Sequence, residues 1–252
     1  MENGIPIIVP LRPSESYQGR CDELRILLRS VDRNVDGCSA VCVVSDELPA
    51  WMRPDAPGLV WVRQGDPYTS CKDANLFLKT HRGMEALGMP ARWCFCADDN
   101  AFLWPCDLRT LPSVFNGTPR DWFARQSGKW YRRMVNTFDW LAARGVEMPY
   151  SHDSHVPQVF TREALERSME APYGDGAGFC IYTLWRGLEG VLRGGVYQPL
   201  VTLRYASPQD LGRIPVAAAA ALPFCTYNDP PFGAGLRERL LALFPEKSRF
   251  EK

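Results

Sequence analysis

Short apolar runs alternate with amphipathic stretches along the first hundred residues of this chain. Leucines and a valine at helical spacing predict a helix over 21–31, and a second periodic stretch predicts another over 72–87. Four runs have the length and the β-branched or aromatic character of buried strands: 5–9, 40–44, 59–62 and 93–97. Strands that alternate with helices are typical of a doubly wound, mostly parallel sheet, so we predict an α/β fold.

The pattern is less regular after residue 105. Thr161 followed by Glu163 and Leu165 predicts the capped start of a helix, and 236–244 has the spacing of a short amphipathic helix. We therefore expect one domain with a Rossmann-like half, 1–105, and an irregular half, 106–252.

Composition limits the classes of partner. With 252 residues, 46% of them hydrophobic, the chain can bury a full core. The 29 basic and 29 acidic residues cancel, so any polyanion must be bound locally. No apolar run approaches the roughly 20 residues that span a bilayer, and the amino terminus lacks the features of a signal peptide. We expect no membrane partner, a cytoplasmic location, and nine scattered cysteines that are buried free thiols.

Two carboxylates and an amide end the fourth predicted strand. Asp98, Asp99 and Asn100 follow a buried apolar run, and open α/β sheets bind ligands at the carboxyl ends of their strands. Oxygen ligands suit Mg²⁺ or Mn²⁺, above all when substrate phosphates complete the coordination. The same residues are also typical of a turn or a helix cap, and the pattern alone leaves both interpretations open.

A basic and aromatic segment covers 120–144. Its aromatic side chains, which include Trp130, lie among arginines such as Arg132 and Arg133. Basic side chains mixed with aromatic ones can bind phosphates while stacking bases or sugars. The alternative is a helix or hairpin whose aromatics belong to the core and whose arginines form a solvated face.

Two histidines follow this segment. His152 and His155 are three residues apart, which would place them on one face of a helical turn, and imidazole binds ions such as Mn²⁺. The alternative is a surface turn ahead of the helix that Thr161 caps.

The order of these motifs resembles a known family. The pieces are Asp22-Glu23-Leu24-Arg25, Leu28-Arg29-Ser30-Val31, Lys72-Asp73-Ala74-Asn75, Asp98-Asp99-Asn100-Ala101-Phe102-Leu103, His155-Val156-Pro157, Tyr227-Asn228-Asp229 and the carboxyl-terminal stretch 243–251. Together they resemble the A-type (GT-A) nucleotide-sugar glycosyltransferase fold. They are more similar to small bacterial and phage proteins related to the stealth capsule-sugar phosphotransferases. Asn100 departs from the Asp-x-Asp motif of that fold.

The resemblance implies a division of roles. Residues 1–105 would bind a nucleoside diphosphate sugar, most simply a UDP-sugar, and 106–252 would bind the acceptor. Asp98, Asp99, Asn100 and His155 would hold Mn²⁺ or Mg²⁺. The implied donor-binding residues are Arg12, Lys72, Asp73 and Asp98, and the expected acceptor-binding residues are Trp130, Arg132 and Arg133.

The implied activity is metal-dependent transfer of a sugar to a hydroxyl. A hydroxyl needs a base because its pKa is far above neutrality, and Asp175 and Asp229 are the candidates. Phage relatives and the basic segment favour a hydroxymethylated pyrimidine in DNA as the acceptor. The alternatives are a glycan-directed glycosyltransferase or sugar-phosphate transferase, and a non-catalytic module that binds nucleotide sugar.

Overall fold

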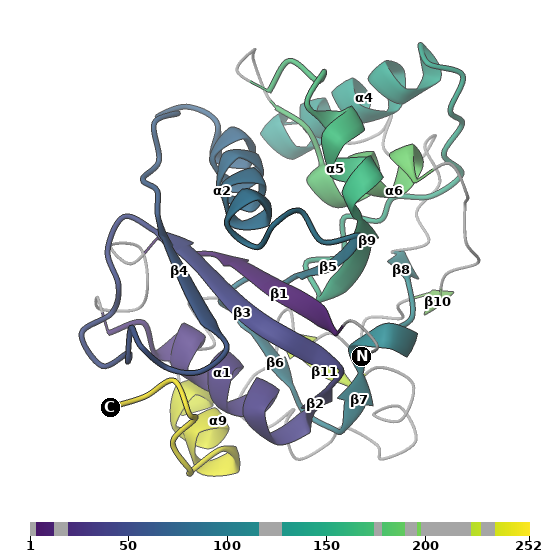
Figure 1. Ribbon diagram of the computed structural model, residues 1–252. Coiled ribbons are helices and arrows are strands. Elements are labelled where there is room, and N and C mark those ends of the chain that lie inside the picture. The colour runs from purple at the N-terminus through teal and green to yellow at the C-terminus, as the bar shows by residue number, and fades with distance from the viewer. Residues whose placement is uncertain are drawn as a thin grey trace.

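A five-stranded sheet forms the centre of the molecule (Figure 1). The computed structural model describes residues 4–12, 20–115, 128–173, 178–189, 196–197, 223–227 and 235–252. The strands of the sheet are β1 (Ile5–Pro10), β3 (Cys38–Ser45), β4 (Leu59–Arg63), β5 (Arg92–Phe95) and β9 (Gln158–Thr161). They lie in the order β4-β3-β1-β5-β9, and all pairs are parallel except β5 with β9. The sheet is therefore mostly parallel, as the sequence predicts.

The strand order changes direction beside β1. From β1 the chain adds β3 and then β4 on one side, and it returns to place β5 on the other side. Such a reversal is a topological switch point, where the carboxyl ends of two neighbouring parallel strands open a crevice for ligands. In this protein the switch point lies between β1 and β5.

Helices cover both faces of the sheet (Figure 1). One face carries α1 (Asp22–Asn34), with α9 (Arg237–Leu243) packed against it, and the other carries α2 (Lys72–Ala86), α4 (Gly128–Ala142), α5 (Arg162–Ser168) and α6 (Ile181–Leu188). The pleat of β1 assigns its side chains to the two layers: Ile8 packs on the α2 side, whereas Ile7 and Val9 pack on the α1 side. This arrangement confirms a doubly wound α/β fold.

Short strand pairs extend from the sheet. β6 (Asn100–Phe102) pairs antiparallel with β11 (Phe224–Thr226). The parallel pairs are β2 (Val35–Asp36) with β7 (Cys106–Asp107), and β8 (Val114–Phe115) with β10 (Val196–Tyr197); a 3₁₀ turn, η3 (Leu108–Thr110), follows β7. Because β6 begins directly after Asp99, it fixes the end of the strand-end turn.

The irregular half completes the core of the first half. Trp93 of β5 packs against Phe160 of β9 and Trp185 of α6, with ring centroids 5.5 and 4.9 Å apart. The helix that Thr161 caps is α5, where the Thr161 hydroxyl accepts a hydrogen bond from the Ala164 amide. All nine cysteines are free, as predicted; seven are buried as expected, and Cys38 and Cys106 are half-buried. No helix in the described ranges is long and apolar enough to cross a membrane.

Candidate functional site

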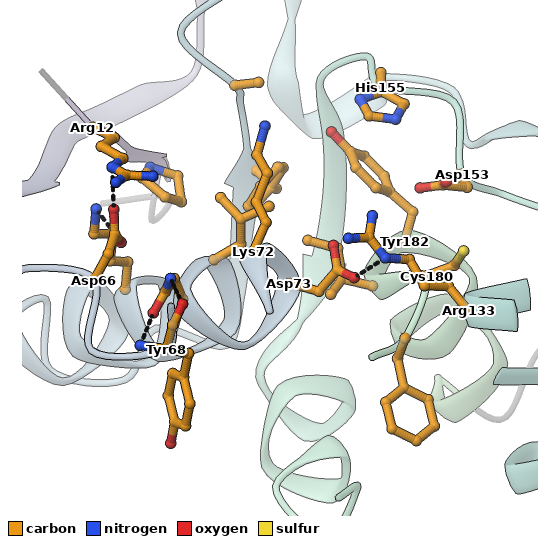
Figure 2. Close-up of a pocket in the computed structure, with 18 of the residues that line it drawn as sticks. Arg12, Asp66, Tyr68, Lys72, Asp73, Arg133, Asp153, His155, Cys180 and Tyr182 are labelled. Atoms are coloured by element: carbon orange, nitrogen blue, oxygen red, sulfur yellow. Dashed lines mark hydrogen bonds and ion pairs between the residues drawn. The ribbon is translucent and has the colours of Figure 1, made fainter. Parts of the chain in front are cut away.

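A cavity of about 460 Å³ opens at the switch point between β1 and β5. Its walls come from the residues after these two strands, the loop 66–70, the first turns of α2, α4 and α6, and the loop before β9. Figure 2 shows its polar side chains facing one another across this space. The fold therefore gathers residues from both halves of the chain around one site.

The predicted strand-end motif lies at this cavity as a turn. Asp98 and Asp99 both line it. The turn is closed by Asn100, whose amide donates to the Ala97 carbonyl at 3.3 Å and whose side-chain oxygen accepts from the Ala97 amide at 3.0 Å. The turn interpretation is confirmed for Asn100, and Asp98 and Asp99 line the cavity, where their role as metal ligands stays a prediction.

Asn100 also anchors the histidine loop. Its side chain is fully buried, and its Nδ2 donates to the His155 carbonyl at 3.1 Å. It is not among the described residues that line the cavity. The role of Asn100 as a metal ligand stays a prediction. Its hydrogen bonds hold the turn that carries Asp99 against the loop that carries His155.

The two histidines do not share a face, because residues 152–155 form no helical turn. His152 is buried, and its Nδ1 lies 2.9 Å from the Val114 carbonyl oxygen. Burial lowers the pKa of His152 to about 4, so the ring is neutral and structural. His155 instead is exposed, has a left-handed backbone with φ of 54°, and lines the cavity.

One wall of the cavity carries cations around a shared carboxylate. Asp66 lies 2.7 Å from the Lys79 ammonium and 3.3 Å from the Arg12 guanidinium. Lys79 also donates to the Leu11 carbonyl at 2.7 Å, which ties α2 to the end of β1. Arg12, a predicted donor-binding residue, thus lines the cavity next to a buried ion pair.

The first turn of α2 contributes the next predicted residues. Lys72 is exposed and lines the cavity, while Asp73 is buried beside it. Asp73 Oδ2 lies 2.7 Å from Arg133 Nε, although this contact lacks the alignment of a hydrogen bond. Burial raises the pKa of Asp73 to about 6, and Arg133 opposes that rise. A buried carboxylate that titrates near neutrality is typical of functional sites.

The three predicted acceptor-binding residues lie on α4, and only two of them line the cavity. Trp130 lines the cavity and donates its indole N–H to Asp153 Oδ2 at 3.0 Å, and Arg133 pairs with Asp73. Arg132 is exposed and lies outside the described cavity lining. Phe138 is buried in the core, as the alternative of a helix with core aromatics expects. The segment is thus partly cavity wall, partly core and partly solvated face.

Both predicted bases, Asp175 and Asp229, lie outside the described residues. The cavity has other polar residues that the sequence did not single out: Asp66, Asp153 and Tyr182. Asn75, which stands in a sequence motif without a predicted role, also lines the cavity, and its side chain exchanges two hydrogen bonds with the backbone of Tyr68, at 3.0 and 2.9 Å. The only sequence signal for these residues is their nearness to predicted motifs, because their partners are distant in the chain.

Whether the cavity can hold a metal ion depends on the side chains that could ligate it. In the described ranges, no group of three His, Cys, Asp or Glu side chains is placed to hold a metal. Asp98 and Asp99 line the cavity together, and Mg²⁺ is often held by one or two carboxylates plus substrate phosphates. Asp98 and Asp99 therefore fit an ion shared with a phosphate ligand.

No protein-family model matches this chain, and a search of curated proteins gives no significant match.

Proposed function

We propose that the protein transfers a sugar from a nucleoside diphosphate sugar, most simply a UDP-sugar, to a hydroxyl group. The observation that carries the proposal is the position of Asp98, Asp99 and Lys72 around one cavity at the switch point of a doubly wound sheet. The strand order, with an antiparallel strand after four parallel ones, is compatible with the A-type glycosyltransferase fold that the motifs resemble.

Charge at the leaving group is the chemical problem of this reaction. A nucleoside diphosphate leaves readily only when its developing negative charge is neutralised. Lys72 supplies a cation at the start of α2, and the first amides of that helix favour an anion; the helix has no side-chain N-cap bond to occupy them. Asp98 and Asp99 would hold Mg²⁺ or Mn²⁺ together with the two phosphates, where the ion supplies further neutralisation.

A donor screen tests the proposal. The protein is incubated with UDP- and GDP-sugars, with Mn²⁺ or a chelator, and with hydroxymethylated DNA or a glycan, and the products are identified by mass. We expect metal-dependent consumption of one donor. Release of a nucleoside monophosphate would instead identify sugar-phosphate transfer, and binding without consumption would identify a non-catalytic module.

Asp99→Ala tests the site. We expect at least a hundredfold loss of transfer in a protein that still folds, because removing one group that stabilises transition-state charge costs about 10²–10³ in rate. Asp55→Ala is the matched control, since the Asp55 side chain is 81% exposed and lies outside the described cavity lining. Full activity of folded Asp99→Ala would exclude this carboxylate from the reaction.

A further inference from the structure

One wall of the cavity has a different chemistry from the rest. We define the α6 wall as Asp73, Trp130, Arg133, Asp153, Cys180 and Tyr182, which all line the cavity. Figure 2 shows Arg133, Asp153 and Tyr182 of this group opposite Arg12 and Asp66, with Lys72 between the two sets. The two sides of the site therefore face different parts of any ligand that fills it.

Tyr182 carries a buried hydroxyl that has no hydrogen-bond partner among the described residues. The side chain is 3% exposed, and edge contacts with Phe95 and Phe160 hold its ring at centroid distances of 5.2 and 6.0 Å. In Figure 2 the ring extends from α6 into the site, with its hydroxyl on the side of His155. A buried hydroxyl without a partner costs free energy, so a ligand that bonds to it gains affinity.

This hydroxyl is a donor at every physiological pH. Burial raises the pKa of Tyr182 well above its ordinary value, and the nearby Asp153 and Asp99 raise it further. The phenol is therefore protonated, and it can both donate and accept a hydrogen bond.

The charge of the α6 wall disfavours phosphate. Within this set Asp73 and Asp153 are carboxylates, and Arg133 is the one cation, already paired with Asp73. The two carboxylates lie close enough for Asp153 to raise the pKa of Asp73. Lys129 is nearby, and its ammonium donates to the Ser70 carbonyl at 2.7 Å. A phosphate at this wall would meet carboxylate repulsion, whereas ligand hydroxyls can donate to both carboxylates.

The wall also has a fixed aromatic surface. The hydrogen bond from Trp130 to Asp153 holds the indole ring in place at the cavity. A rigid aromatic ring beside a few convergent polar groups is typical of sites for small polar ligands, because the ring buries apolar atoms while the polar groups set orientation.

We propose that the α6 wall binds the hydroxyl groups of an uncharged sugar ring, with Tyr182 as donor and Asp73 and Asp153 as acceptors. This inference rests on the proposed function. It orients the ligand in the cavity, with its phosphates near Lys72 and its sugar against the α6 wall. It also makes this wall a poor site for the phosphate backbone of DNA. The ring can belong to the donor or to the acceptor, since both present the same hydroxyl chemistry.

Saturation-transfer NMR with Tyr182→Phe tests the inference. The probes are UDP-glucose, UDP-galactose, UDP-N-acetylglucosamine and GDP-mannose, the parent nucleotides UDP and GDP, and the methyl glycosides of the same sugars. We expect Tyr182→Phe to bind sugar-bearing probes about five- to tenfold more weakly, the effect of one lost hydrogen bond. Affinity for UDP or GDP alone should stay unchanged.

The variant is expected to fold, because it removes a hydroxyl that has no partner among the described residues. Tyr150→Phe is the control, since Tyr150 is 40% exposed and stacks on Phe115 away from the described cavity lining. Asp73→Asn should weaken the binding of the same probes as Tyr182→Phe does, because a neutral amide accepts hydroxyl hydrogen bonds less strongly than a carboxylate.

Each outcome has one meaning. If a nucleotide sugar binds more tightly than its parent nucleotide, and Tyr182→Phe removes this difference in affinity, the donor sugar lies at this wall. If Tyr182→Phe instead weakens the binding of methyl glycosides, the acceptor lies there. Sugar probes that bind equally well to Tyr182→Phe, or that never bind, overturn the inference even if UDP binds. Glycosides that bind through Tyr182 while no nucleotide binds support the wall and contradict the proposed donor.

Discussion

Asp73 shows how a single buried carboxylate couples the site to stability. Its pKa is raised from 3.8 to about 6, so its ionised form destabilises the folded protein above pH 6, and the destabilisation disappears as pH falls toward 4. We predict that Asp73→Asn is more stable than the wild type at pH 7.5, by up to about 3 kcal/mol for a shift of about two pKa units. The two proteins should be equally stable near pH 4.

Urea unfolding at both pH values measures this difference, with Asp55→Asn as the exposed control. An Asp73→Asn protein that is less stable at pH 7.5 would mean that the contact with Arg133 outweighs the cost of burying the charge.

His152 has the opposite pH dependence. Its folded pKa of about 4 lies below its ordinary 6.5, so its contribution to stability is complete above pH 6.5 and is lost as pH falls toward 4. We predict that His152→Asn, whose amide can still donate to the Val114 carbonyl, loses less stability than the wild type between pH 6.5 and 4.5. Urea unfolding at both pH values checks this, with His81→Asn as the control. If the two variants lose the same free energy of unfolding, groups other than His152 cause the acid sensitivity.

The sequence predicted the charged residues of the site better than their contacts. Asp98 and Asp99 line the cavity, and periodicity alone predicted their place at a strand end. Lys72, Asp73 and Arg12 line it too, but only the family resemblance singled them out. Asp153 and Tyr182 were missed because neither belongs to such a signal: one lies in a loop and the other in an unpredicted helix. The exchange between Asn75 and the Tyr68 backbone was missed for a different reason, since it depends on the three-dimensional path of a loop.

At the scale of elements, the segments with a clear helical period and the long β-rich runs were predictable, and α6 was not. Half of the eight residues of α6 are β-branched or aromatic types that favour strands, so its helical form depends on packing in the core. β9 was not predicted, and β6 and β11 have three residues each, so their pairing depends on tertiary context more than on propensity. Of these elements, α6 lines the cavity that α2 and the ends of the predicted strands begin.

Helix α1 holds the carboxyl-terminal segment through a buried ion pair. Arg29 donates to both Glu251 oxygens, at 2.7 and 2.9 Å, and to the Phe244 carbonyl at 3.0 Å. We predict that Arg29→Ala destabilises the protein by about 3 kcal/mol, the lower end of the range for a broken buried pair, because Glu251 keeps Arg25 at 3.4 Å and the Ser248 amide at 3.0 Å. Arg29→Ala combined with Glu251→Ala should recover part of that loss. A double-mutant cycle by urea unfolding measures the coupling, and a loss below about 1 kcal/mol would show that solvent replaces Arg29.

At the scale of the whole molecule, the switch point explains why one cavity collects residues from both halves of the chain. β1 and β5 supply its floor and α2 supplies Lys72 and Lys79. The wall that we assign to a sugar combines residues of α4 and α6 with Asp73 of α2 and Asp153 of the loop before β9. We propose that this cavity binds a nucleoside diphosphate together with a divalent ion.

Calorimetric titration of UDP and GDP into the protein, with Mn²⁺ or with chelator, measures this binding. We predict saturable binding of one nucleotide with Mn²⁺, at least about tenfold weaker binding with chelator, and a similar loss in Asp99→Ala, as expected when one interaction of roughly 1.4 kcal/mol or more is removed. Nucleotide affinity that is the same with and without Mn²⁺ and in Asp99→Ala, or no nucleotide binding under either condition, would contradict the proposal.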